Sequence, residues 1–186
     1  MSAAAIIVTG VVAIVLGWSL RVFNRLVRLR NQVRSAWADI DVQLLRRHDL
    51  VPQLVASVQA LVEHERTTLE SLSALRAQAI QAVGTPGQVH IEHALGKGLE
   101  QLLLLREAYP ALASNAGFTQ LQQQLVEVES HLQYARRFYN GAVRALNDAV
   151  QRAPDLLIAR CADIGPAEFF EVAPGQAQSP RVEMNR

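Results

Sequence analysis

The chain has 186 residues, of which 50% are hydrophobic and only 5% aromatic, and its formal net charge is +1. This length suits one domain with accessory segments, and the nearly balanced charge gives no broad field that would attract nucleic acid, so we expect no nucleic-acid partner. The single cysteine, Cys161, excludes an internal disulfide and any cysteine-based zinc site.

The first predicted element is an uncharged apolar helix that extends from Ala3 to Leu20. Its eighteen residues approach the lower limit for crossing a bilayer core of about 30 Å. A cleaved secretory signal carries basic residues before its apolar run, whereas here the basic residues come after it. We therefore predict that residues 1–20 form a retained, single transmembrane anchor. The alternative is a buried helix of a soluble protein.

The residues at the end of this helix have the composition of a membrane interface. Trp18 lies where an interfacial aromatic residue belongs, and five arginines precede the first acidic residue, Asp39. The positive-inside rule then places the short N-terminus outside the inner membrane and the rest of the chain in the cytoplasm. The arginines either bind anionic lipid head groups or only set this topology. The predicted interface residues are Trp18, Arg21, Arg25, Arg28 and Arg30.

Residues 21–155 are predicted to form a bundle of helices. Apolar residues spaced three and four apart keep one narrow stripe along the first helix, which suits coiled-coil-like packing. This stripe consists of Val22, Leu26, Leu29, Val33, Trp37, Ile40 and Leu44. Pro52 then predicts either a kink or a short break, with Asp49 as the N-cap of a second helix. That helix ends at the turn formed by residues 84–87, Gly-Thr-Pro-Gly.

Two more long helices follow the turn. One extends from about Val89 to Ala108 and stops before a proline, since a residue that precedes proline avoids the helical conformation. The other begins after Ser114 or Asn115, either of which can cap it, and ends before Pro154. Its apolar repeat is the most regular in the chain and consists of Phe118, Leu121, Leu125, Val128, Leu132, Ala135, Tyr139, Ala142, Leu146 and Ala149.

Residues 156–186 are predicted to form a C-terminal tail that is partly disordered, with disorder beyond Val172. Within it, Phe169 and Phe170 are expected to pack onto the bundle. Short turns between long helices make neighbouring helices antiparallel. The expected fold class is therefore all-α: an N-terminal transmembrane helix followed by an elongated, antiparallel, up-and-down helical bundle.

Short motifs follow one another along the chain: Ala36-Trp37, Ile40 to Leu44, Arg46-Arg47, Asp49 to Pro52, Leu54-Val55, Glu107, Tyr109-Pro110, Phe118, Leu121-Gln122, Glu129, Ala135-Arg136, Tyr139-Asn140 and Asn147. In order and spacing they resemble the LemA family of bacterial membrane proteins, and the resemblance covers about residues 23–154. The run from Ala36 to Val55 is the more specific, and it departs from the family pattern at His48 and Gln53. A later departure is at Ala108.

This resemblance implies a single N-terminal anchor and a cytoplasmic helical bundle, with no agreed enzymatic activity and no catalytic residues to carry over. Some relatives are linked to magnetosome membranes and others to membrane-bound zinc peptidases of the heat-shock type. These links imply that the protein functions as a scaffold or adaptor.

The polar residues between positions 39 and 49 are candidates for an interaction surface. Asp41, Gln43 and Arg47 form a polar layer that either fixes helix register or receives a partner, and Asp49 completes the candidate surface. The alternative is a solvated helix face with Asp49 as a cap. Tyr139 fits the apolar stripe, so its ring belongs in the core and its hydroxyl group needs a partner.

The remaining polar clusters do not converge on one point. His90 and His93 share a helix face, but they lack a second set of ligands and Glu92 points elsewhere, so we expect no metal site and no cofactor. Glu127, Glu129 and other acidic residues are predicted to lie on the surface, although Glu65 falls near the apolar stripe.

We therefore expect a non-catalytic scaffold or adaptor that is anchored in the membrane and forms homo-oligomers. One alternative is a regulatory partner of a membrane-bound zinc peptidase, and the other is a cryptic metal site in the bundle.

Overall fold

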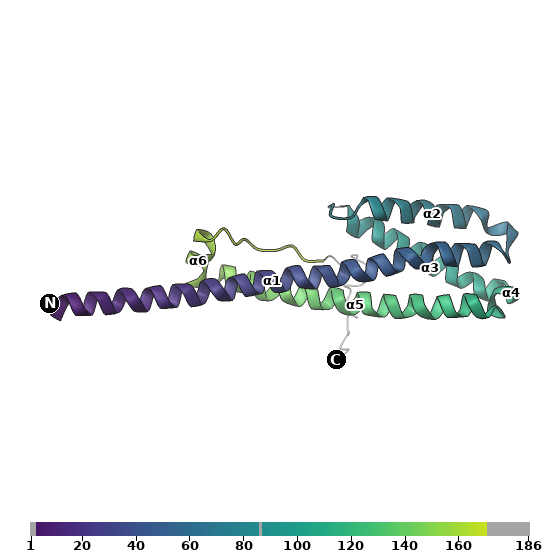
Figure 1. Cartoon of the computed structure of the whole chain (residues 1–186). Helices are drawn as coiled ribbons and strands as arrows, with labels where there is room; N and C mark the ends of the chain where they lie inside the picture. The colour runs from purple at the N-terminus through teal and green to yellow at the C-terminus, as the bar shows by residue number, and fades with distance from the viewer. Residues whose placement is uncertain (1–2, 86, 171–186) are drawn as a thin grey trace, which may run out of the picture. The chain divides into compact units, whose positions relative to one another are not determined.

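The computed structural model describes residues 3–85 and 87–170, and within these ranges every regular element is a helix, so the fold is all-α as predicted. The predicted disorder beyond Val172 lies outside the described residues. The elements are α1 (Ala3–Gln59), the 3-10 helix η1 (Glu63–Glu65), α2 (Arg66–Gln81), α3 (Gln88–Ala108), α4 (Pro110–Ala113), α5 (Ala116–Gln151) and α6 (Asp155–Cys161) (Figure 1).

Helix α1 passes through Pro52 without interruption, so the predicted break with Asp49 as an N-cap is wrong. A proline inside a helix offers no N–H to the carbonyl four residues earlier, which here belongs to His48. The Nε of Arg76 on α2 donates to that carbonyl oxygen at 2.7 Å. The side chain of Gln53 also donates to the carbonyl of Asp49 at 3.0 Å. Side-chain donors thus satisfy the carbonyls around the proline and allow the helix to continue.

The interruption comes after Gln59 instead. Val62 has an extended backbone, with φ −139° and ψ 99°, and its side chain is buried. The 3-10 helix η1 then leads into α2. No glycine or proline lies between residues 53 and 83, so the sequence carries no local signal for this turn. The bend is explained by tertiary packing, since burial of an apolar side chain such as Val62 stabilises by about 1.5–3 kcal/mol.

The boundaries of α3 agree with the prediction to within one residue. The helix ends at Tyr109, whose backbone is extended with φ −122° and ψ 97°. The short helix α4, with Pro110 in its first turn, was not predicted. Asn115 is the cap of α5, because its Oδ1 accepts a hydrogen bond from the N–H of Phe118 at 2.8 Å.

The chain divides into two compact units. Unit 1 comprises the chain up to Ile40 and Tyr134–Phe169, and it contains parts of α1 and α5 together with α6. Trp37 on α1 meets Tyr139 on α5 edge to face, with ring centroids 5.2 Å apart. Arg25, earlier on α1, pairs with Asp155 beyond the end of α5. Residue numbers therefore fall along α5 as they rise along α1, which makes the two helices antiparallel within this unit.

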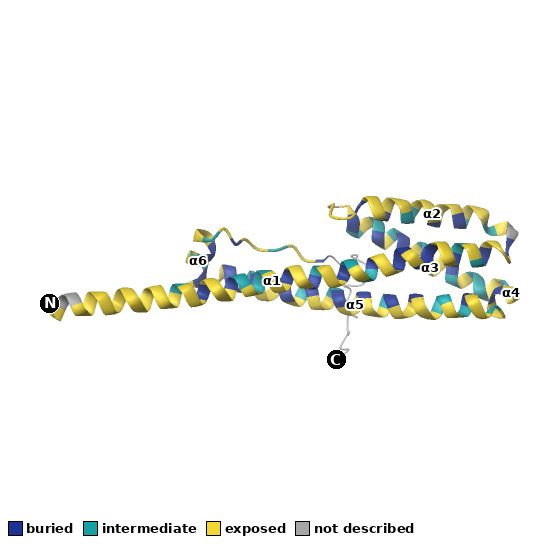
Figure 2. Cartoon of the chain, viewed as in Figure 1, coloured by how far each residue is buried: buried dark blue, intermediate teal, exposed yellow. Residues whose placement is uncertain are grey.

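Unit 2 comprises Asp41–Gln133 and the chain from Phe170, and it contains the rest of α1 and α5 with α2, α3 and α4. Gly98 allows α2 and α3 to approach closely, because a Cβ atom at this position would lie 3.1 Å from Cδ1 of Leu72. Most of the predicted apolar stripes are buried (Figure 2). The core of unit 2 includes Val51, Leu54, Val58, Leu69, Leu72, Leu95, Leu99, Leu102, Leu112, Phe118, Leu125 and Val128.

Helix α6 covers the start of residues 156–186, which were predicted to form a partly disordered tail. Its first residue, Asp155, is held by Arg25, a residue more than a hundred positions earlier. The local signals of this helix are Asp155 in its first turn and Arg160 in its last turn. Of the two phenylalanines expected to pack, Phe170 is buried as predicted, whereas Phe169 is 47% exposed and that prediction is wrong. The proposed division into anchor, bundle and tail stays a prediction.

Candidate functional site

The N-terminal part of α1 exposes its apolar side chains on all sides. The segment near the N-terminus is long and apolar enough to cross a membrane, with a mean hydropathy of 2.2 and only 6% of the most apolar stretch buried. Figure 2 shows the described residues of this part of the helix almost entirely as exposed. A core helix of a soluble protein is mostly buried, so the exposure disfavours that alternative. The exposed large residues are Ile6, Ile7, Val8, Val11, Val12, Ile14, Val15, Leu16 and Leu20.

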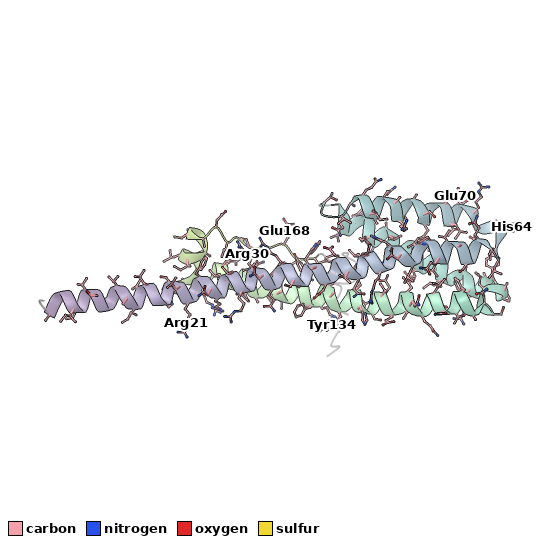
Figure 3. The ribbon with its side chains drawn as sticks, viewed as in Figure 1. Arg21, Arg30, His64, Glu70, Tyr134 and Glu168 are labelled. Atoms are coloured by element: carbon pink, nitrogen blue, oxygen red, sulfur yellow. The ribbon has the colours of Figure 1, made fainter. Side chains whose placement is uncertain are left out.

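The predicted interface residues lie directly after this apolar segment. Trp18 is 38% exposed, and Arg21 and Arg28 are exposed on α1. Arg30 is half-buried, and Figure 3 labels it together with Arg21 along the same helix. Arg25 differs from the others, because its Nη1 lies 3.0 Å from Oδ2 of Asp155, whose side chain is only 10% exposed. Arg25 therefore also holds α6 beside α1, a role that the sequence did not reveal.

A buried cluster of charged side chains lies inside unit 2. Arg47 is 2% exposed, so two of its predicted roles, in an interaction surface and on a solvated face, are wrong, and its burial agrees with the remaining one, a polar layer that fixes helix register. Its Nη1 donates to the carbonyl oxygen and to Oε2 of Glu92 at 3.1 and 3.2 Å. Its Nη2 donates to Oε2 of Glu129 at 2.6 Å. The guanidinium group thus joins α1 to both α3 and α5.

His48 completes this charged cluster. Its Nε2 lies 2.8 Å from Oε1 of Glu92, and both side chains are buried. A carboxylate oxygen accepts hydrogen bonds, so Nε2 carries the proton in this contact. Glu92 therefore receives two donors from neighbouring residues of one helix. Since a buried charge is costly unless it is paired and hydrogen-bonded, the cluster accounts for a glutamate that is only 1% exposed.

Helix α3 leaves room for the guanidinium group at Gly96. A Cβ atom at this position would lie 3.7 Å from Nη2 and 3.8 Å from Nη1 of Arg47, which is ordinary contact. A larger side chain would compete with the arginine for the same space. His90 and His93 are exposed on α3 while Glu92 is buried, so the glutamate does point away from the two histidines as expected. Among the described residues no group of three His, Cys, Asp or Glu side chains could hold a metal ion.

Asp41 belongs to a separate polar contact in unit 2. Burial raises the pKa of its carboxyl group, and a hydrogen bond from the side chain of Gln88 partly opposes that increase. The Oε1 of the same Gln88 accepts the N–H of Gly84 at 2.9 Å. Gln88 therefore ties the turn before α3 to α1. Of the other two predicted surface residues, Gln43 is half-buried and Asp49 is exposed.

Sequence reasoning missed two members of the charged cluster, His48 and Glu129. His48 appeared only as a departure from the family pattern, while Glu129 was assigned to the surface although it is only 34% exposed at the side chain and pairs with Arg47. The spacing of Glu129 one position after Val128 did place it beside the apolar stripe. Glu65 was singled out correctly: it accepts hydrogen bonds from the hydroxyl groups of Tyr109 at 3.0 Å and of Thr68 at 3.1 Å.

The chemistry of the cluster is structural. An arginine that spans two carboxylates fixes the register of three helices, because each alternative register would leave a buried charge unpaired. The described residues thus define an all-α protein that has one apolar helix able to cross a membrane and a charged layer inside its helical core. The chain belongs to the LemA family, whose family model matches residues 36–184. The comparison with curated proteins found no match.

Proposed function

We propose that this protein is a membrane-anchored, non-catalytic scaffold or adaptor that presents its helical units to the cytoplasm for self-association or partner binding. The observation that carries the proposal is the exposed apolar segment of α1, which continues without a break into a helix whose next part is buried in unit 1. An apolar segment of this size is stable only when lipid or another protein covers it.

The arginines after this segment support the orientation. Arg21, Arg25, Arg28 and Arg30 come before any acidic residue, as expected for the cytoplasmic side of a single-pass protein. Exposed arginines at this level also suit anionic lipid head groups, at about 1 kcal/mol for each residue close to the surface. The non-catalytic character is supported by the charged cluster, in which the terminal nitrogens of Arg47 bond the carboxylates of Glu92 and Glu129, and His48 bonds Glu92.

The native cysteine allows a direct test of anchoring and orientation. Cys161 is the single cysteine of the chain and it is exposed, so a membrane-impermeant maleimide reports its side of the membrane without any substitution. We expect the protein to resist carbonate extraction and Cys161 to react in inverted vesicles but not in intact spheroplasts.

A matched control moves the thiol to the other side of the membrane. In a chain that carries Cys161→Ser and Ser2→Cys, the introduced thiol should react in intact spheroplasts. Labelling of Cys161 from outside would reverse the proposed orientation. A mature chain that lacks residues 1–20 and leaves the membrane fraction would show that the apolar segment is a cleaved signal, and would refute anchoring.

A further inference from the structure

An extended segment follows α6 in unit 1, and we refer to Ile164–Phe169 as the strap. It has no helical or strand structure. The end of α6 sets the direction in which the strap leaves the helix. The N–H of Ile164 donates to the carbonyl of Ala159 at 3.0 Å, and Asp163 between them has a positive φ of 52°. This is the geometry in which a helix ends with one left-handed residue. The chain therefore turns sharply at Asp163, between α6 and the strap.

Helix α5 holds the strap through its backbone. The Nδ2 of Asn147 donates to the carbonyl of Ala167 at 2.9 Å, and its Oδ1 accepts the N–H of the same residue at 2.8 Å. The hydroxyl group of Tyr139 donates to the carbonyl of Glu168 at 2.9 Å. Figure 3 labels Glu168 on the strap. We call Tyr139 and Asn147 the clamp.

The clamp is rigid and partly buried. Tyr139 is 7% exposed and its ring meets that of Trp37 edge to face, so the hydroxyl group is fixed in position. Burial, and the nearby charge of Glu168 to a smaller extent, raise the pKa of Tyr139, which keeps the hydroxyl group protonated as a donor. Asn147 lies two turns further along the same helix.

These contacts recognise an extended peptide by its main chain. An amide side chain that both donates to and accepts from one residue matches the two polar groups of an extended backbone, whatever the side chains are. Few side chains of the strap are enclosed by the protein. Ile164 is buried and Ala167 is half-buried, while the intervening Gly165 and Pro166 are exposed. Pro166 favours an extended conformation, which reduces the entropy that the strap loses on docking.

We infer that the clamp is an extended-peptide site which, in the self-associated protein, takes the strap of a second copy of this chain in place of its own. The inference rests on the proposed scaffold function. The strap is a ligand that the clamp is shown to fit, and each copy carries it. Exchange between copies repeats the same contacts, which makes it a low-cost route to association. Anchoring in one membrane raises the local concentration of copies and favours exchange.

The turn at Asp163 provides the hinge for this exchange. A left-handed conformation is unfavourable for a residue other than glycine, although aspartate tolerates it better than most. Straightening the chain at this position relieves that cost and redirects the strap away from its own α5. Helix α6 stays with its own chain through the contact of Asp155 with Arg25.

Disulfide trapping in the full-length, membrane-embedded protein tests the exchange. All chains carry Cys161→Ser. One tagged chain carries Asn147→Cys, and a second chain with a different tag carries Ala167→Cys. After mild oxidation we expect mixed dimers that carry both tags, several times more abundant than with a control partner that carries Glu100→Cys, since Glu100 is an exposed residue of α3.

A third chain with both Asn147→Cys and Ala167→Cys gives the reference. Closure of its disulfide within one chain shows that the two positions can react. If it closes while the mixed dimers stay at the level of the Glu100→Cys control, the strap remains in its own chain and the inference is overturned. Disulfide-linked products with other proteins, without mixed dimers, would assign the clamp to a different peptide and would also overturn it.

Carbonate extraction of the same samples keeps the two proposals apart. Protein that stays in the membrane without mixed dimers refutes strap exchange alone. Protein that is extracted from the membrane refutes the anchor, whatever the strap does.

Discussion

The two units fix their helices with different chemistry although both are built on the same three-and-four apolar spacing. Unit 2 places a charged layer in its core, where Arg47 bridges Glu92 and Glu129. In unit 1 the neutral side chains of Asn147 and Tyr139 bind the backbone of the strap, and the ion pair of this unit, between Arg25 and Asp155, has an arginine whose side chain is 57% exposed. A charged layer holds the helices strongly but does not tolerate substitution, because the loss of one member leaves a buried charge unpaired. The loss of one member of a neutral clamp leaves no buried charge, so it costs less. The difference suggests that unit 2 maintains register while unit 1 offers the adjustable contact.

The largest effect is expected in the charged layer. Arg47→Met leaves Glu92 buried without its guanidinium partner, so the free energy of unfolding should fall by about 3–5 kcal/mol. The neighbouring Arg46 is exposed, and Arg46→Met should change the same quantity by less than about 0.5 kcal/mol. Denaturant unfolding in detergent, followed by circular dichroism, measures both. Similar values for the two variants would contradict a structural role for the cluster.

The contact across Pro52 should have the next largest effect. Arg76→Ala removes the charged donor to the carbonyl of His48, at a cost of about 1.5–3 kcal/mol. In a chain that also carries Pro52→Ala, the restored N–H can take the same carbonyl, so the cost of losing Arg76 should be less than half as large. A double-mutant cycle on unfolding free energies measures this coupling. Additive effects would show that Arg76 does not substitute for the missing backbone donor.

The neutral clamp of unit 1 should contribute less. Asn147→Ala removes two hydrogen bonds to Ala167 and leaves its backbone groups to be solvated, with an expected loss of about 1–3 kcal/mol. Fluorescence of Trp37, in a Trp18→Phe background, reports whether the environment of Tyr139 changes as well. Asp148→Ala, an exposed neighbour, is the matched control. An unchanged free energy of unfolding for Asn147→Ala would show that the clamp does not stabilise unit 1.

The smallest effect concerns Asp41 and depends on pH. Burial raises the pKa of Asp41, so the folded state binds its proton more tightly than the unfolded state does. The stability that this proton provides is present at low pH, and it is lost as the pH rises from the ordinary aspartate value through the raised pKa. Asp41→Asn should therefore be more stable than the parent at pH 7, by less than about 1 kcal/mol because the group is partly solvated.

Unfolding curves recorded from low to neutral pH test this sign. The advantage of Asp41→Asn should vanish below the ordinary aspartate pKa, where both side chains are neutral. An advantage that is independent of pH would point to packing, and a variant that is less stable at neutral pH would contradict the direction of the pKa change.

The sequence by itself determined the helical class, the apolar segment of residues 3–20 and most of the buried faces. These features are local: periodicity decides which face of a helix is apolar, and proline, glycine and asparagine mark several of its ends. A cap at Ser114 or Asn115 and a stop before Pro110 were predicted on that basis; the structure has the cap at Asn115 and the stop at Tyr109.

Only the tertiary structure decided how polar groups are used. The path of α1 through Pro52 depends on Arg76, and the burial of Arg47 depends on two glutamates from other helices. The turn at Val62 likewise has no local signal. In each case the stabilising partner lies far away in the sequence, so the free energy of the contact exists only after the helices have packed. A charged or amide side chain read from the sequence is therefore equally compatible with solvent, with a core ion pair or with a backbone clamp.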